Sequence, residues 1–390
     1  MTFRLGVEVL LQSRMTLLQD ARVGAVVHPA SVLSNLRHTA DALSDSIAPR
    51  LKALFGPQHG AHGEKQDNMI ESESYCDPDT QLPVHSLYGE TRRPTEEMMH
   101  EIDVLIYDLQ DAGTRVYTFI WTMAYCLEAC AQFGKRLIVL DRPNPINGRQ
   151  VEGNLLNTSL RSFVGLHPIP MRHGLTVGEL ALFFNKEFSL GCDLTVIPME
   201  GWRRSAWFEE TGLRWVPPSP NLPTIDSTVV YPGMVLVEGT MLSEGRGTTR
   251  PFEFIGAPYI QAREYSVRLN SLGLPGVLFR AAYFQPTFQK WAGIICGGVQ
   301  VHVTDRQAFE PYLTGIMSIS VARAMYPQSF AWREPPYEYE YRRMPIEILC
   351  GSEAIPHLIE KGASPEEFRA SWRGDVARFL RQREPYLLYD

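Results

Sequence analysis

Four short apolar runs constrain the fold of this 390-residue chain more than any other feature. They cover residues 23–27, 51–55, 103–107 and 136–140. Each run is short enough for a buried strand and stops at a turn rich in glycine, proline or polar side chains. Helical or crossover segments separate the runs, and this alternation predicts a parallel sheet with right-handed connections. We therefore expect an α/β fold with a Rossmann-like parallel-sheet domain.

The composition of the sequence changes at about Leu278. From there, segments rich in aromatic and β-branched residues, at 277–284 and 294–303, alternate with helical segments at about 306–325 and 365–382. A chain of this length ordinarily forms two domains. We predict a Rossmann-like domain over residues 1–259 and a smaller α/β domain over residues 260–390.

The composition excludes several classes of function. A net charge of −7 argues against a nucleic-acid surface, which requires clustered basic residues. No apolar stretch is long enough for a membrane span, and the first residues lack the pattern of a signal peptide. Cys126 and Cys130 lie four residues apart in an apolar helix, which indicates core thiols in a reducing compartment. We expect a cytoplasmic protein.

Cofactor motifs are missing from the sequence. No GxGxxG motif follows a predicted strand, which argues against dinucleotide binding, and neither a Walker loop nor an HExxH motif occurs. The histidines lack ligand spacing, and the acidic residues do not form a compact coordination cluster. We expect neither a cofactor nor a metal.

Polar side chains gather directly after the predicted strands, where open parallel sheets bind their ligands. These positions supply the candidate site residues Gln58, His59, Asp108, Asp111, Arg115, Tyr117, Asp141 and Asn144. A polar excursion over residues 61–94 adds Glu64 and Glu71, and loops of this length are usually functional or mobile. The alternative for both glutamates is a solvated loop carboxylate.

Two further candidates lie in the middle of the chain. His173 precedes an apolar helix in which Thr176 and Glu179 match a capping box, so Glu179 is interpreted as structural. Asn221 lies in a proline-rich segment, 216–224. Such a segment either holds Asn221 at a site or only joins two layers of the fold.

A polar stretch over residues 238–253 contains Glu244, Arg246 and Arg250. Two arginines among small residues suit two-pronged capture of a carboxylate or phosphate. The alternative is a structural ion-pair cluster that joins the domains.

Seven motifs occur in a fixed order: GPQHG, SLYGETRRPT, DLQDAGTRVYT, LDRPNPING, RHGLTVGELA, PPSPNLPT and EGTMLSEGRGTTRPFE. Together they resemble the NamZ-like exo-β-N-acetylmuramidases, and the similarity covers nearly the whole chain. The resemblance implies a Rossmann-like catalytic domain, an auxiliary C-terminal domain and a cleft between them. It also implies hydrolysis of terminal non-reducing β-N-acetylmuramic acid from peptidoglycan fragments, with a small amino sugar or muropeptide as substrate.

One motif departs from the family pattern. The commoner form is GPEHG, whose glutamate is the proposed catalytic acid, whereas this chain has Gln58, which has no acidic proton to give. Glycoside hydrolysis normally needs two carboxyl groups. We predict Glu64 as the acid, then Glu71, with Asp108 as a buried candidate. Burial can raise the pKa of Asp108, and Arg115 is close enough in sequence to oppose this by pairing. Gln58 could orient the acetamido group of the substrate.

The remaining candidates are interpreted as substrate ligands. Arg246 and Arg250 suit the lactyl carboxylate that distinguishes muramic acid from glucosamine, while His59 and His173 suit its hydroxyl or acetamido groups. Two alternatives stay open because of Gln58. One is a related hydrolase or lyase that acts on another acidic sugar, and the other is a non-catalytic carbohydrate-binding homologue.

Overall fold

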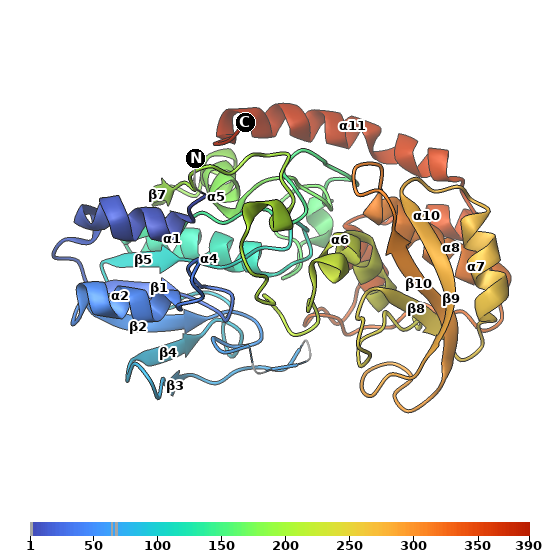
Figure 1. The fold of residues 1–390 in the computed structure, drawn as a ribbon, viewed down its shortest axis with the longest axis horizontal. Helices are drawn as coiled ribbons and strands as arrows, with labels where there is room; N and C mark the ends of the chain where they lie inside the picture. Colours follow the sequence, from blue (N-terminus) through green and yellow to red (C-terminus); the bar gives the residue numbers. More distant parts are fainter. Residues whose placement is uncertain (1–2, 64, 67–68) are drawn as a thin grey trace.

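The computed structural model describes residues 3–63, 65–66 and 69–390 (Figure 1). Within these residues, a seven-stranded sheet has the order β3-β4-β2-β1-β5-β6-β7, and β3 alone among its strands is antiparallel to its neighbour. The strands are β1 Val23–Val26, β2 Leu51–Gly56, β3 Tyr75–Cys76, β4 Pro83–Ser86, β5 Val104–Tyr107, β6 Arg136–Leu140 and β7 Asp193–Ile197. The Rossmann-like sheet predicted from the apolar runs is confirmed.

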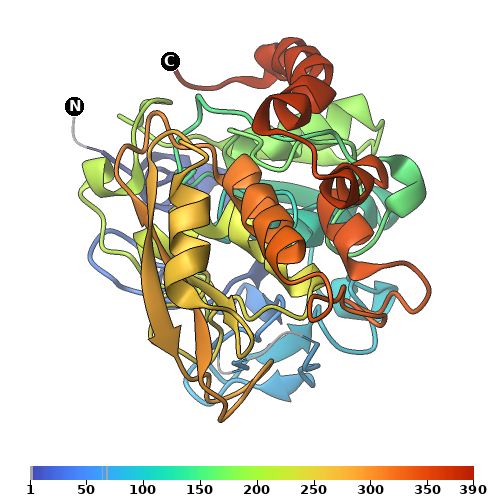
Figure 2. The ribbon, with the colours of Figure 1, turned by 90° about the vertical axis from the view of Figure 1, so that its right-hand side faces the viewer.

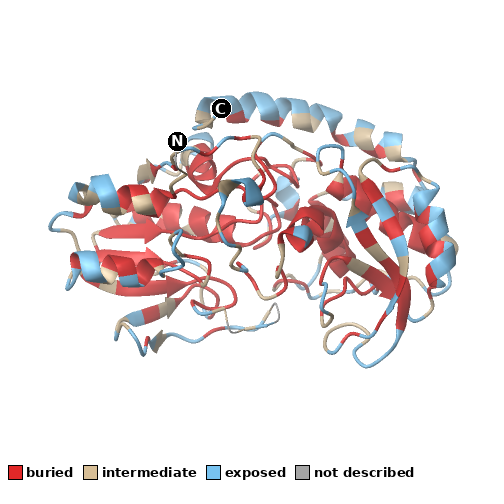
Figure 3. Ribbon diagram, viewed as in Figure 1, coloured by how far each residue is buried: buried red, intermediate tan, exposed pale blue. Residues whose placement is uncertain are grey.

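Both faces of the sheet are covered, which explains why its central strands are apolar throughout (Figure 3). Side chains of β5 alternate between two cores: Leu105 and Tyr107 face one, and Val104 and Ile106 face the other. The first core includes residues of α4 Phe119–Gln132 and α5 Val177–Glu187. The second includes residues of α1 Gly6–Val9 and α2 Thr39–Ile47.

Helix starts follow the expected chemistry. Thr176 accepts a hydrogen bond from Glu179 N, and the Glu179 side chain accepts one from Thr176 N, so the predicted capping box is confirmed. Thr95 caps α3 Glu96–Met99 by accepting from Met98 N.

A three-stranded antiparallel sheet of order β8-β10-β9 forms the centre of the second half. The strands are β8 Phe254–Ala257, β9 Val277–Phe284 and β10 Cys296–Val303. The helices here are α6 Ile225–Met234, α7 Ala262–Asn270, α8 Pro311–Met325, α9 Pro345–Cys350, α10 Ala354–Lys361 and α11 Pro365–Arg383. Helix α7 packs across β9 and β10 and against α8 (Figure 2). The smaller α/β unit is confirmed, while its boundary at residue 259/260 stays a prediction.

Helix α11 joins the two halves, while α6 and α8 pack closely within the second. They cross at Gly233 and Gly315, where an added Cβ on Gly233 would lie 1.8 Å from Pro311 O, so glycine is required for this approach. Helix α11 runs along the top of the molecule from the second half to the first (Figure 1). At its end, Arg383 Nη1 donates to the carbonyl of Gly174 at 2.8 Å.

No helix in the described part of the chain combines the length and the apolar character that crossing a bilayer requires.

Candidate functional site

A polar cavity lies where the loops after β2 and β5 meet the second half of the chain. Its lining consists of Gln58, His59, Val116, Tyr117, Thr118, Val164, Ser219, Asn221, Tyr231, Glu238, Arg246, Phe252, Tyr337 and Glu338. Ligands of open parallel sheets bind beyond the carboxyl ends of the strands, and β2 ends two residues before Gln58. The structure thus brings together Gln58, His59, Tyr117, Asn221 and Arg246, all predicted from the sequence as substrate ligands.

The turn after β2 fixes the amide of Gln58. His59 and Gly60 both have positive φ (74° and 86°), which turns the chain sharply after the strand. Gln58 Oε1 accepts a hydrogen bond from Thr118 Oγ1 at 2.6 Å. The amide nitrogen therefore faces the opposite way, 3.1 Å from Tyr88 OH and 3.4 Å from Glu338 Oε1.

Glu338 is a buried carboxyl group that the sequence analysis did not identify. Its side chain is 5% exposed, and Oε2 accepts a hydrogen bond from Tyr88 OH at 2.8 Å. Burial raises the pKa of Glu338, and the charge of Glu238 adds to this effect, while hydrogen bonds from Tyr88 and Gln58 only partly oppose it. Glu338 therefore keeps its proton to a higher pH than an ordinary glutamate does.

Glu238 lines the same cavity, and its pKa is shifted in the opposite direction. It accepts hydrogen bonds from Arg246 Nη2 at 2.7 Å and from Tyr337 OH at 2.8 Å. Burial disfavours its charged form, but the charge and hydrogen bond of Arg246 and the Tyr337 bond outweigh burial and lower the pKa of Glu238. Two carboxyl groups whose pKa values are pushed apart are the arrangement that general acid catalysis uses.

Arg246 connects the cavity to a buried ion-pair cluster. Its Nε lies 3.4 Å from Glu244 Oε1, and Glu244 in turn pairs with Lys290 Nζ at 2.7 Å. Within the described chain, Arg246 Nη1 is buried and has no hydrogen-bond partner. The ion-pair cluster considered from the sequence therefore exists, and it leaves one amino group of this lining residue without a hydrogen bond.

An open groove adjoins the cavity at Asn221, which lines both. The groove has a volume of about 910 Å³, and its wall includes Phe254, Tyr283, Phe284 and Phe288. The cavity itself holds only about 40 Å³, far less than the groove. A sugar ring bound at the cavity must therefore extend toward this groove.

Comparison with known proteins identifies the family. The family model for the N-terminal part of exo-beta-N-acetylmuramidase NamZ matches residues 23–226, and that for its C-terminal part matches residues 229–389. The chain belongs to the NamZ family. It is 46% identical over 384 residues to the peptidoglycan beta-N-acetylmuramidase NamZ of Bacillus subtilis (strain 168), covering 98% of this chain and 91% of that protein.

Solved structures share the NamZ-family fold. Two crystal structures of DUF1343 family proteins from Bacteroides fragilis NCTC 9343 match over 100% of this chain and 99% of each of theirs. One has a TM-score of 0.89 at 36% identity, and the other has a TM-score of 0.80 at 30% identity. The likeness therefore includes both the parallel-sheet part and the smaller sheet.

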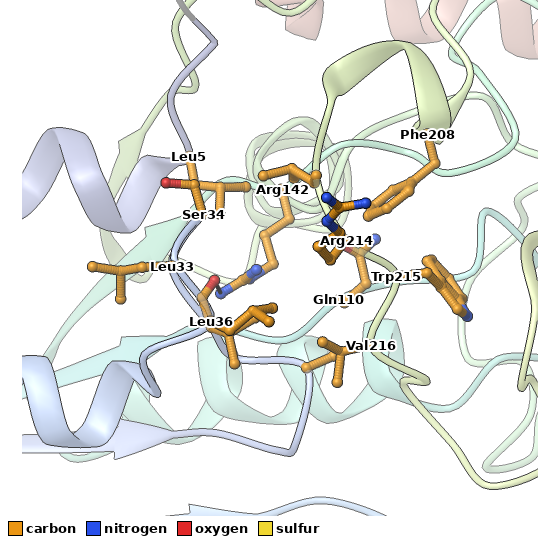
Figure 4. A pocket seen from close by; sticks show the side chains of 13 residues that line it. Leu5, Leu33, Ser34, Leu36, Gln110, Arg142, Phe208, Arg214, Trp215 and Val216 are labelled. Atoms are coloured by element: carbon orange, nitrogen blue, oxygen red, sulfur yellow. Dashed lines mark hydrogen bonds between the residues drawn. The ribbon is translucent and has the colours of Figure 1, made fainter.

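Asp108 lies outside the cavity lining of this NamZ-family protein, in an ion pair. Its Oδ1 lies 2.6 Å from Arg142 Nε, and its Oδ2 accepts from Arg142 Nη2 at 2.8 Å and from Thr39 Oγ1 at 2.6 Å. Arg142 borders a different, largely apolar pocket of about 20 Å³ beside Trp215 (Figure 4). The sequence suggested Arg115 as the arginine that pairs with Asp108, and this was wrong: its partner is Arg142.

Arg115 is buried beneath the site, between the two halves. Its guanidinium donates to the carbonyls of Asn154, Ile169, Leu349 and Cys350 at 2.7–3.2 Å. These bonds give the side chain a structural environment, and its predicted contact with substrate stays untested.

Asn144, Asp111 and His173 also lie outside the cavity lining. Asn144 Nδ2 donates to Leu175 O at 2.9 Å. Asp111 Oδ2 accepts from Gly113 N at 2.8 Å and lies 3.2 Å from His173 Nε2, while His173 Nδ1 accepts from Leu175 N at 3.1 Å. These side chains hold the loops after β5 and β6 in place.

The other predicted residues lie on the surface or outside the described chain. Glu71 is exposed and lies 3.5 Å from Arg92 Nη2, and Arg250 is largely exposed beside Glu253. Glu64, the first-ranked candidate acid, lies outside the described residues. In the described part of the chain, no group of three or more histidine, cysteine and acidic side chains could hold a metal ion.

Asp141 anchors the C-terminal tail. Its Oδ2 accepts from Tyr389 OH at 2.5 Å and from Thr176 Oγ1 at 2.8 Å, and its Oδ1 accepts from Gly178 N at 2.8 Å. Burial raises its pKa from 3.8 to about 7, against the effect of these hydrogen bonds. The predicted substrate role of Asp141 stays untested, while its contacts are those of a structural group.

We predict that Asp141 makes the protein less stable as pH rises from about 4 to 7. In this pH range the folded protein keeps the Asp141 proton, whereas the unfolded chain releases it. The stability that this protonated group contributes is therefore complete below about pH 4 and is lost as pH rises through about 7. The shift corresponds to about 4 kcal/mol. The free energy of unfolding of Asp141→Asn, measured with denaturant across this pH range, should lack the fall with pH that Asp141 causes in the wild type. Parallel curves for the two proteins would contradict the prediction.

Proposed function

We propose that this protein is a glycoside hydrolase that removes terminal non-reducing β-N-acetylmuramic acid from peptidoglycan fragments. Its near full-length similarity to the Bacillus subtilis NamZ supports this function. The observation that carries the proposal is the pair of buried carboxyl groups in oppositely shifted states, Glu238 and Glu338, in one cavity beside Arg246. Glycoside hydrolysis requires one protonated carboxyl group and a means of stabilising positive charge at the anomeric carbon.

The cavity offers a ligand for each feature of muramic acid. Arg246 Nη1 is a buried cationic donor suited to the lactyl carboxylate. Gln58 and Asn221 present amide groups, His59 an imidazole and Tyr117 a hydroxyl, to the acetamido and hydroxyl groups of the sugar. These roles, and those first assigned to the predicted residues outside the cavity lining, are proposals.

The geometry favours attack at a chain end. The cavity is small and enclosed, while the groove beside Asn221 is open and aromatic. We place the terminal sugar at the mouth of the cavity and the rest of the glycan in the groove, where Tyr283 is 72% exposed and can stack on a sugar face. With the proposed domain boundary at 259/260, the auxiliary domain supplies Tyr337 and Glu338 to the catalytic domain's cavity.

We place this activity in cytoplasmic recycling of cell-wall fragments. In the described structure all six cysteines are free thiols, and five of them are buried. Free thiols of this kind suit a reducing compartment.

The test is product analysis. The protein is incubated with the disaccharide N-acetylmuramyl-β-1,4-N-acetylglucosamine and with a panel of other acidic-sugar disaccharides, and products are identified by mass spectrometry. We expect free N-acetylmuramic acid from the first substrate. Preferred cleavage of another sugar would support the alternative hydrolase or lyase. Calorimetric binding without turnover would support a carbohydrate-binding homologue.

A further inference from the structure

We infer that Glu338 is the catalytic acid that gives its proton to the glycosidic oxygen, in the role that the family resemblance assigns to a glutamate at position 58. The inference rests on the proposed function and assigns one residue within it. It explains how a chain with glutamine at this position can still cleave a glycosidic bond.

The hydrogen bonds of Gln58 place its amide nitrogen beside the carboxyl group of Glu338. Thr118 Oγ1 donates to Gln58 Oε1 at 2.6 Å, which fixes the amide so that Nε2 points toward Tyr88 OH and Glu338. An amide nitrogen has no acidic proton to transfer. Gln58 is therefore a positioning residue, and the carboxyl oxygen that its amide nitrogen contacts is Glu338 Oε1, 3.4 Å away.

The other carboxyl group of the cavity is unsuited to this role. Among the described residues of the lining, only Glu238 and Glu338 carry carboxyl groups. Arg246 and Tyr337 both donate to Glu238, which stabilises its charged form. Among the hydrogen bonds and ion pairs of the described residues, Glu338 has no such cationic partner, and its burial favours the protonated form.

The backbone of Glu338 supports a functional position. Its φ is 46°, and the next residue, Tyr339, has a φ of 65°. Residues other than glycine seldom adopt this region, and such conformations concentrate at active sites. This segment turns the carboxyl group inward, where it meets side chains that are 250 and 280 residues away in the sequence.

The proposed step balances in atoms and charge. The Oε–H bond of Glu338 breaks as the C1–O bond of the muramic acid breaks. The proton and the bonding electron pair both go to the leaving oxygen, which departs as a sugar hydroxyl, and Glu338 becomes a carboxylate. Water supplies the new oxygen at C1, and the proton that this water releases returns to Glu338.

The test compares Glu338→Gln on two substrates that differ in their need for an acid. We expect a loss of about 10²- to 10⁴-fold in kcat/KM on the disaccharide, because general acid catalysis contributes this much. On the 2,4-dinitrophenyl glycoside of N-acetylmuramic acid, whose leaving group needs no proton, we expect a loss below about tenfold. The activity of the wild type on the disaccharide should fall at high pH, where Glu338 loses its proton. This fall should be absent with the dinitrophenyl glycoside.

Two further variants complete the test. Glu340→Gln removes a carboxylate two positions away, outside the cavity lining, and should leave both activities unchanged. The double variant Gln58→Glu, Glu338→Gln returns a carboxyl group to position 58 and should recover at least tenfold of the lost disaccharide activity. The double variant keeps one carboxyl and one amide group at the two positions. It can therefore replace Glu338→Gln in this test if that single variant folds poorly.

The outcomes separate this inference from the proposed function. Equal losses of Glu338→Gln on both substrates, or a disaccharide loss below threefold, would overturn the role of Glu338 while leaving the hydrolase function intact. Failure of the double variant to recover activity would also count against it. Wild-type protein that cleaves neither substrate would overturn the proposed function, and this inference with it.

Discussion

Arg115→Met should reduce the free energy of unfolding by about 3–6 kcal/mol, because each unpaired buried polar group costs about 1–3 kcal/mol. Arg115 donates to four carbonyls, of which those of Leu349 and Cys350 belong to α9 in the second half of the chain. Methionine fills similar space and donates to none of them. Cys350 O keeps one donor, Asn154 Nδ2 at 2.9 Å, so the expected loss falls below the sum for four groups.

Denaturant unfolding checks this prediction. The matched control is Arg323→Met, because Arg323 makes one hydrogen bond, to Glu360 O at 3.2 Å, and lies at the surface. The control should change stability by less than about 0.5 kcal/mol. If Arg115→Met also remained within 1 kcal/mol of the wild type but lost activity, the guanidinium would belong to the substrate site, as first predicted from the sequence.

The sequence predicted the sheet well because its signals are local. An apolar run of four or five residues that ends at a turn marks a buried parallel strand, and β1, β2, β5 and β6 all fall on such runs. The edge strand β3 has two residues and no such run, so it could not be predicted. Helices α9 and α10 have only six and eight residues, which is too short for their apolar residues to show a helical period.

Five of the fourteen residues that line the cavity could be predicted, in part for a topological reason. Gln58 and Tyr117 follow neighbouring regions of one sheet edge, where carboxyl ends of strands converge. The Asp108–Arg142 pair has the same topological origin, because β5 and β6 are neighbours in the sheet. Asp108 is the first residue after β5, and Arg142 is the second residue after β6. Proximity along the sequence instead suggested Arg115, which shows that strand adjacency is the better guide.

Glu338 could not be predicted from the sequence. It lies in an alternating run of tyrosine and glutamate after two prolines, a pattern that gives no period for a helix. Its partner Gln58 is 280 residues away, and no local rule connects such positions. The glutamine at position 58 was the one signal, because it required that the acid lie elsewhere, and only the fold shows where.

Arg246→Lys should lower the preference for muramic acid over N-acetylglucosamine by about 10- to 100-fold. A hydrogen bond to a charged group contributes about 1.5–3 kcal/mol, which corresponds to this range. Lysine keeps the positive charge beside Glu238 but lacks the second amino group, so it cannot bind Glu238 and a substrate carboxylate in the geometry of the guanidinium fork. The ratio of kcat/KM for the aryl glycosides of the two sugars measures the effect.

Lysine is the better variant because alanine would confound binding with folding. Removing one member of a buried charge pair costs about 3–5 kcal/mol, since the remaining charge is left without a partner. Arg246→Ala would leave Glu238 in this state and would also weaken the pairing around Glu244. Arg306→Lys, at a surface pair with Glu209, controls for the exchange itself and should leave the ratio unchanged.

The remaining arginine makes the prediction sharper. Arg250 was predicted from the sequence as a second ligand of the lactyl carboxylate, but it is 44% exposed at the side chain and its nearest charged partner is Glu253 at 3.4 Å. If Arg250→Ala lowered the sugar ratio while Arg246→Lys did not, the carboxylate would bind at the outer surface of this segment. Because Arg246 is the buried one of the two and lines the cavity, we expect the reverse.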